Sequence, residues 1–129
     1  MTTILFVEDD ADDRDFFTLA LTEVNPDAVL TPATNGQEAI EILSTLDPNE
    51  LPCVIVLDLN MPVMDGYQTL RALEGQPAYA AIPKVILSTS DLEENKRKCL
   101  SHGAADYLVK PADIKKWAGT VHTILNFCS

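Results

Sequence analysis

The chain has 129 residues, and its 20 acidic and 9 basic side chains give it a formal net charge of −11. This length suits one domain with one hydrophobic core, and so negative a chain is repelled by nucleic acid and by anionic membranes. The sequence therefore predicts a single domain over residues 1–129 that pairs with cations or with basic protein surfaces.

The start of the chain and its cysteines indicate a cytoplasmic protein. Met1-Thr2-Thr3 leads into a strand without the features of a signal peptide, and no apolar run reaches membrane-spanning length. Cys53, Cys99 and Cys128 are odd in number and lie outside any metal-binding or redox spacing. We therefore expect three reduced thiols, which are usual in the cytosol, and we expect Cys53 to fill the core.

The first half of the chain alternates apolar runs with helical periodicity. Residues 4–7 are apolar at every position, which indicates an interior strand that is covered on both faces. After the first helix, Val29–Ala33 forms a weaker strand, and Pro32 places that strand at the edge of the sheet. Asn35 and Glu38 predict a capping box at the start of the second helix.

The third strand covers residues 53–57 and ends at Asp58. A loop rich in turn residues follows over residues 60–66, and it leads into a short helix. Gly75 and Pro77 then close this helix, because neither residue favours its continuation.

The last part of the chain repeats the alternation twice. Residues 85–87 form the fourth strand, and Asp91 with Glu94 predicts a capping box for the helix that ends near His102-Gly103. Residues 107–109 form the fifth strand. The last helix is expected to begin directly after Pro111.

Five strands and five helices with short connections predict an α/β fold, a doubly wound parallel sheet with strand order 2-1-3-4-5. In such a sheet the carboxyl ends of the strands meet at one edge, where ligands bind. Four strands end there at groups suited to phosphoryl transfer, namely Glu8 with Asp9, Asp58, Ser88 and Lys110.

Asp58 is the candidate nucleophile of this edge. A carboxylate held in line with a phosphoryl donor can attack phosphorus and form an aspartyl phosphate. The attack needs positive charge near the phosphoryl oxygens, which Lys110 and a divalent cation could supply. Glu8, Asp9 and Asp58 would crowd like charges together, and a hard cation such as Mg²⁺ relieves that repulsion.

Four motifs, spread over nearly the whole chain, resemble the receiver domain of two-component response regulators. They are Val7-Glu8-Asp9-Asp10, Leu57-Asp58-Leu59-Asn60-Met61-Pro62, Leu87-Ser88-Thr89 and Tyr107-Leu108-Val109-Lys110-Pro111. Thirty positions separate Asp58 from Ser88 and 22 separate Ser88 from Lys110, which is similar to the spacing in CheY-like single-domain receivers. The resemblance implies a flavodoxin/CheY-like three-layer αβα fold.

The resemblance also implies the roles of the metal-site residues. Asp9 and Asp58 would bind Mg²⁺ (or Mn²⁺) directly, Asn60 would bind it through its backbone carbonyl, and Glu8 would act through water. A register shifted by one residue, with Asp9 and Asp10 as the acidic pair, stays open.

The remaining implied roles concern the phosphoryl oxygens and the switch. Ser88, or Thr89 in its place, would donate its hydroxyl to one phosphoryl oxygen, and Lys110 would pair with another. The Tyr107 ring would turn inward when Ser88 moves. Receivers also commonly have a cis peptide bond at the position of Lys110-Pro111.

The function that follows is that of a single-domain response regulator in a two-component phosphorelay. It would accept a phosphoryl group on Asp58 from a histidine kinase or a histidine phosphotransfer protein. It would be no enzyme beyond slow autophosphorylation and autodephosphorylation. The chain leaves no room for an effector domain, so a surface of the last two helices and the fifth strand would signal to a downstream protein. We expect a monomer or weak dimer.

Two other classes fit the residues less well. A phosphatase of the haloacid-dehalogenase type needs a second Asp where Asn60 stands, and a nucleotide binder needs a glycine-rich anion cradle. A receiver that is never phosphorylated also stays open, although all four site elements are present. Other acidic residues near the first helix, Asp12, Asp13 and Asp15, are explained by its macrodipole alone.

Overall fold

The computed structural model describes residues 2–128 and contains five strands that alternate with helices. The strands are β1 (Thr3–Val7), β2 (Val29–Ala33), β3 (Val54–Leu57), β4 (Lys84–Ser88) and β5 (Asp106–Val109). The helices are α1 (Ala11–Val24), α2 (Gly36–Ser44), α3 (Gly66–Glu74), α4 (Pro77–Ala80), α5 (Glu93–Ser101) and α6 (Trp117–Leu125). Short 3₁₀ turns are η1 (Pro48–Glu50), η2 (Ile114–Lys116) and η3 (Asn126–Cys128).

The five strands form one parallel sheet in the order β2-β1-β3-β4-β5, as the sequence predicts. Every residue of β3 and β4 is buried, because these interior strands are covered on both faces. β2 is partly exposed and contains Pro32, which an edge strand tolerates since one side of its backbone needs no partner. The predicted fold class and strand order are therefore confirmed.

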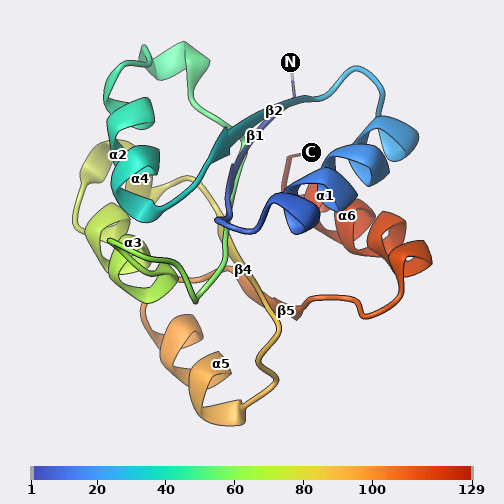
Figure 1. Cartoon of the computed structure of the whole chain (residues 1–129). Helices are drawn as coiled ribbons and strands as arrows, with labels where there is room; N and C mark the ends of the chain where they lie inside the picture. Colours follow the sequence, from blue (N-terminus) through green and yellow to red (C-terminus); the bar gives the residue numbers. More distant parts are fainter. Residues whose placement is uncertain (1, 129) are drawn as a thin grey trace.

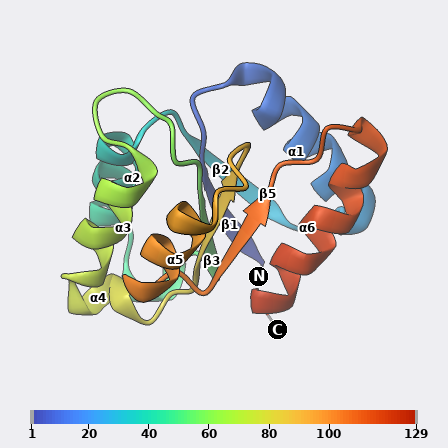
Figure 2. The ribbon, with the colours of Figure 1, turned by 90° about the horizontal axis from the view of Figure 1, so that it is seen from below.

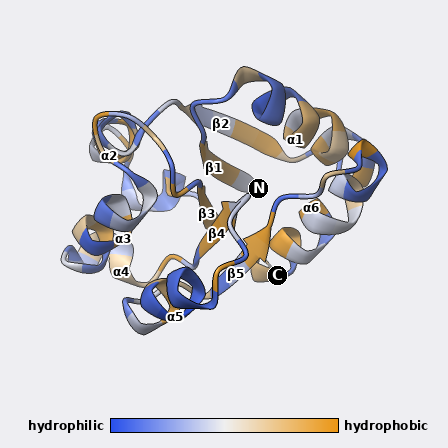
Figure 3. Ribbon diagram, turned by 60° about the horizontal axis from the view of Figure 1, so that its bottom comes forward, coloured by the Kyte–Doolittle hydropathy of each residue, from blue (hydrophilic) through white to orange (hydrophobic). Residues whose placement is uncertain are grey.

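Helices cover both faces of the sheet. α1 and α6 lie on one face, and α2, α3 and α5 lie on the other (Figures 1 and 2). Each face has its own apolar core, one around Phe6, Phe17 and Trp117 and the other around Leu57 and Leu70. The strands between the two layers are predominantly hydrophobic and α5 is largely hydrophilic (Figure 3).

The helix starts agree with the sequence in part. Asn35 caps α2, and its side chain accepts a hydrogen bond from the Glu38 backbone N–H at 2.9 Å. The predicted capping box is incomplete, because the Glu38 side chain accepts from the Thr34 hydroxyl instead. α5 begins after Leu92 and has no side-chain cap, so the predicted capping box of Asp91 and Glu94 is wrong. A capping box that the sequence analysis did not single out, formed by Asp65 and Gln68, begins α3.

The connection from α3 to β4 and the connection from β5 to α6 differ from the prediction. Pro77 does not merely end α3, because it is the first residue of the short helix α4. Asp113 caps the 3₁₀ turn η2, so α6 begins at Trp117 rather than directly after Pro111. No peptide bond among the described residues is cis, and the expected cis bond between Lys110 and Pro111 is therefore absent.

A disulfide bond joins Cys53, just before β3, to Cys128 in η3. The prediction of three reduced thiols is therefore wrong for this pair, and Cys53 is not simply core filling. The two residues are 75 positions apart, so only the folded chain brings them together. Cys99 is a free and buried thiol, as predicted. Among the described residues no helix is long and apolar enough to cross a membrane.

Candidate functional site

Three of the predicted site residues are held at the carboxyl edge of the sheet by backbone hydrogen bonds. Each follows a strand directly, and each donates its N–H to the last carbonyl of a neighbouring strand. The bonds run from Glu8 to Ala33 at 2.9 Å, from Asp58 to Val7 at 3.1 Å and from Lys110 to Ser88 at 2.7 Å. The parallel register therefore continues one residue beyond the strands, which fixes where these side chains begin.

Three carboxylates gather at this edge. One oxygen each from Glu8, Asp9 and Asp58 lies within 4.8 Å of the others. Glu8 is fully buried, Asp58 is 5 % exposed and Asp9 is exposed, so the cluster opens to solvent on the side of Asp9. The predicted pair of Glu8 and Asp9 belongs to this cluster, whereas the Asp10 side chain caps α1.

The ammonium of Lys110 reaches three carboxylates. Its Nζ lies 2.6 Å from Glu8 Oε1, 2.7 Å from Asp13 Oδ2 and 3.3 Å from Asp58 Oδ2, and the Lys110 side chain is only 7 % exposed. The contact between Lys110 and Asp58 confirms the convergence predicted from strand order. The contact with Asp13 was missed, since the helix macrodipole alone explained an acidic residue in the first turn of α1.

The titration of these groups reflects their crowding. Burial, and next the neighbouring Asp58 side chain, raise the pKa of Glu8 to about 8. Burial alone would lower the pKa of Lys110, but the side chains of Asp13, Glu8 and Asp58 outweigh it and raise that pKa. Lys110 is thus held as a cation, while negative charge remains in excess around it.

The residues present fit a hard divalent cation. Glu8 Oε1 is buried and, within residues 2–128, is the one buried side-chain nitrogen or oxygen without a hydrogen bond of good geometry, although Lys110 Nζ lies 2.6 Å away. Three clustered carboxylates are the oxygen ligands that Mg²⁺ or Mn²⁺ prefers. Asn60, the fourth predicted ligand, lies in the exposed loop after β3.

The predicted switch residues lie on adjacent strands. Ser88 is fully buried at the end of β4, and its hydroxyl accepts a hydrogen bond from the Ser90 N–H at 3.2 Å. Tyr107 on β5 is 8 % exposed, and its hydroxyl donates to the Ser90 carbonyl at 2.8 Å. The ring thus already lies inward in this structure and holds the loop that follows Ser88.

The loop after Asp58 is closely packed. A Cβ at Gly66 would collide with the Asp58 carbonyl, so only glycine lets α3 begin so close to this backbone. Val63 in the same loop has a φ of 66°, which a β-branched residue rarely adopts. The sequence analysis treated this segment only as turn-rich, and it gave no sign of the close contact.

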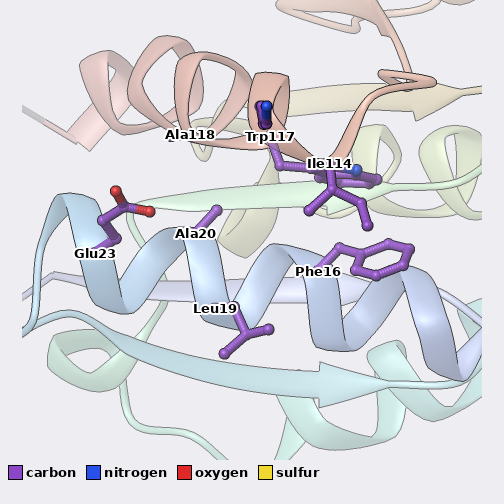
Figure 4. Close-up of a pocket in the computed structure, with 8 residues that line it drawn as sticks. Phe16, Leu19, Ala20, Glu23, Ile114, Trp117 and Ala118 are labelled. Carbon is purple, nitrogen blue, oxygen red and sulfur yellow. The ribbon is translucent and has the colours of Figure 1, made fainter.

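A groove of about 340 Å³ lies outside the acidic cluster, between α1 and α6 (Figure 4). Phe16 and Ala20 from α1 lie toward Ile114 and Trp117, and Leu19 also lines the groove. None of these residues belongs to the predicted site. The groove lies on the face of the sheet that α1 and α6 cover, and the charged residues Glu23 and Lys115 also line it.

The family model described as "Response regulator receiver domain" matches residues 4–122. Among curated proteins the chain is similar to Protein PilH of Pseudomonas aeruginosa. The two sequences are 34 % identical over 125 residues, which is 97 % of this chain and 98 % of PilH. The residues that the family model matches span all the predicted site residues, from Glu8 to Lys110.

Two solved structures have a similar fold. The Mn²⁺-bound form of response regulator Rcp1 has a TM-score of 0.85 at 29 % identity and covers 98 % of this chain and 94 % of its own. The phosphorylated cyanobacterial phytochrome response regulator RcpA has a TM-score of 0.87 at 29 % identity, over 98 % and 92 % of the two chains. Both chains therefore have nearly the same fold and length as this chain.

Proposed function

Because this chain belongs to the family of response regulator receiver domains of two-component systems, we propose that Asp58 is its phosphoryl acceptor. The observation that carries this proposal is the contact of 3.3 Å between Asp58 Oδ2 and Lys110 Nζ, inside a cluster of carboxylates. We further propose that residues 1–129 act as one receiver domain.

In the proposed reaction a carboxylate oxygen of Asp58 attacks the phosphorus of a phosphohistidine in a histidine kinase or phosphotransfer protein. The new P–O bond forms as the P–N bond breaks, and the imidazole nitrogen leaves with the bonding electron pair. Lys110 stabilises the charge on the phosphoryl oxygens. Because Lys110 is almost fully buried, little water screens this interaction.

The acidic cluster would hold a divalent cation, Mg²⁺ or Mn²⁺, through Asp9 and Asp58 directly. Glu8 would bind it through water, and the Asn60 carbonyl would be a further ligand. When bound, such a cation offsets negative charge on the carboxylates and on the phosphoryl oxygens. The buried Glu8 oxygen without a hydrogen bond and the Mn²⁺-bound Rcp1 structure support this assignment.

The switch would connect the phosphoryl group to the surface of α5, β5 and α6. Ser88, or Thr89 in its place, would donate its hydroxyl to a phosphoryl oxygen and thereby move the loop at Ser90. That loop is tied to Tyr107 by a hydrogen bond of 2.8 Å, so movement of the loop reaches β5 directly. We propose that a downstream protein binds the shifted surface.

The remaining proposals concern the setting of the reaction. The protein would act in the cytoplasm as a monomer or weak dimer, without binding nucleic acid or a membrane. It would turn over no substrate and would only lose its own phosphate slowly. The excess of acidic over basic side chains supports the exclusion of nucleic acid and membrane.

Intact-mass measurement after incubation with Mg²⁺ and phosphoramidate tests the proposed acceptor. One phosphoryl adduct is expected on the wild-type protein, with none on Asp58→Ala or when a chelator removes Mg²⁺. The exposed residue Asp12 of α1 provides a matched control, so Asp12→Ala should carry the adduct. An adduct that persists on Asp58→Ala would place the acceptor elsewhere.

A further inference from the structure

The Lys110 ammonium lies closer to a carboxylate of α1 than to the proposed acceptor. Nζ donates to Asp13 Oδ2 at 2.7 Å and to Asp58 Oδ2 at 3.3 Å. Glu8 Oε1 is closer still, at 2.6 Å, so the ammonium is shared among three carboxylates. Asp13 comes from α1 and not from the edge of the sheet, so α1 contributes a carboxylate that fixes the position of this lysine.

The first turn of α1 is itself held in place. Asp10 accepts a hydrogen bond from the Asp13 N–H at 3.0 Å, and its own N–H donates to Glu8 Oε2 at 3.2 Å. Arg14 Nη1 donates to the Glu8 carbonyl at 2.8 Å. The Asp13 side chain is 22 % exposed, so it is partly screened from water. These hydrogen bonds fix the backbone from which the Asp13 carboxylate reaches Lys110.

We propose that Asp13 is a positioning residue that holds the Lys110 ammonium within reach of the phosphoryl group on Asp58. The inference rests on the proposed function of Asp58. An ammonium has three N–H donors, and here Asp13 takes one and Asp58 another. The N–H that points at Asp58 Oδ2 can turn to a phosphoryl oxygen on Asp58 while the bond to Asp13 is kept. Asp13 acts through Lys110 and does not touch the phosphoryl group.

The sign of the expected effect separates positioning from simple electrostatics. An anionic phosphodonor is repelled by a nearby carboxylate, so loss of charge alone would speed phosphorylation in any variant that removes an acidic residue here. Loss of positioning would instead slow it, because a reacting group displaced by about 1 Å costs up to about a hundredfold in rate.

The test compares three variants by intact-mass kinetics with phosphoramidate and Mg²⁺. Asp13→Ala is expected to slow phosphorylation about tenfold, in keeping with a modest displacement of Lys110. Asp13→Asn keeps an acceptor oxygen and should stay within about threefold of the wild-type rate, since the hydrogen bond is retained. Asp12→Ala removes the same charge from the same helical turn but from an exposed side chain, and it should be phosphorylated at the wild-type rate or slightly faster.

A second readout does not depend on phosphorylation. In ¹⁵N-labelled protein without metal, a hydrogen-bonded, buried Lys110 ammonium should give a slowly exchanging side-chain ¹⁵N signal. This signal should persist in Asp13→Asn and Asp12→Ala and be lost in Asp13→Ala. Circular dichroism melts of all three variants confirm that each is folded.

The proposal is overturned if Asp13→Ala phosphorylates at the wild-type rate or faster, or if Asp13→Asn is as slow as Asp13→Ala. It is equally overturned if the ammonium signal is unchanged in Asp13→Ala. Should the wild-type protein take no phosphoryl group on Asp58, the proposed function fails instead, and the ammonium signal alone decides whether Asp13 positions Lys110.

Discussion

Two buried lysines lie at opposite edges of the sheet and are paired differently. Lys84 begins β4 at the amino edge, where its Nζ donates to Glu74 at 2.8 Å and to the carbonyls of Tyr79 and Ala80 at 2.6 and 3.1 Å. All three of its N–H donors are used, and one carboxylate balances its charge. Lys110 at the carboxyl edge instead has three carboxylates within 3.3 Å.

This difference indicates what each edge is for. The amino edge is balanced in charge and is closed covalently by the disulfide between Cys53 and Cys128, so its polar groups stabilise the fold. The carboxyl edge keeps excess negative charge and a buried Glu8 oxygen without a hydrogen bond. Like charges that crowd a crevice lower the stability of the fold. At the carboxyl edge, a bound cation would offset this repulsion, and a phosphoryl group would give Lys110 a new anionic partner.

Reduction of the disulfide should give the largest loss of stability. The bond closes a loop between positions 75 residues apart, and for a loop of this length the expected loss is about 4 kcal/mol in the free energy of unfolding. Urea unfolding with and without a dithiol reductant measures it, in a Cys99→Ser background that removes the free thiol. Equal midpoints in the two conditions would contradict the stabilising role of this edge.

Lys84→Met should be the next most damaging change. It leaves Glu74 and two carbonyls without their donor, and breaking a buried ion pair in this way costs about 3 kcal/mol. The double variant Glu74→Leu, Lys84→Met should recover part of the loss, since no unpaired charge remains. If Lys84→Met unfolds at the wild-type urea concentration, the amino edge is not a structural ion pair.

Mg²⁺ should stabilise the carboxyl edge. At a free concentration a hundredfold above its Kd, a cation that binds only the folded protein adds about 2.7 kcal/mol to the free energy of unfolding. Asp9→Asn should reduce this gain, whereas Asp12→Asn, from an exposed residue outside the acidic cluster, should not. The measurement is urea unfolding at several Mg²⁺ concentrations. A gain that is the same in both variants would place the cation elsewhere.

Asp58→Asn should have the smallest effect on stability, and it should stabilise the protein where the disulfide and Lys84 changes destabilise it. In metal-free buffer it removes one of the crowded carboxylates while Lys110 keeps Glu8 and Asp13, so stability should rise by about 1 kcal/mol. The gain should shrink when Mg²⁺ is added, because the wild-type cluster is then neutralised. A thermal melt that shows Asp58→Asn to be less stable without metal would argue against charge crowding.

The sequence predicted the features that depend on regular strands. Uniformly apolar runs identified β1, β3 and β4, and parallel strand order then brought Asp58 and Lys110 together although 52 positions separate them. Its failures depend on how helices and termini pack. In the sequence Asp13 looks like an ordinary acidic residue in the first turn of a helix, and only the packing of α1 shows its contact with Lys110. Cys128 likewise looks like a lone thiol, and only the folded chain brings it next to Cys53 before β3.

Lys84 shows a further limit of sequence reasoning. A lysine before an apolar strand reads as a solvent-exposed flank, and only the helix pair α3 and α4 supplies the carboxylate and carbonyls that let it be buried. The predicted start of α5 was wrong for a related reason, because Leu92 and not a polar capping residue precedes that helix. Patterns along the chain thus predict elements better than the contacts between them.

The most direct measurement is a crystal structure of the protein after reaction with phosphoramidate in the presence of Mg²⁺. The account predicts a phosphoryl group on Asp58, with Lys110 Nζ bonded both to a phosphoryl oxygen and to Asp13, and with the cation held among Glu8, Asp9 and Asp58. A phosphoryl group on another residue, or a Lys110 side chain that points away from Asp58, would contradict it.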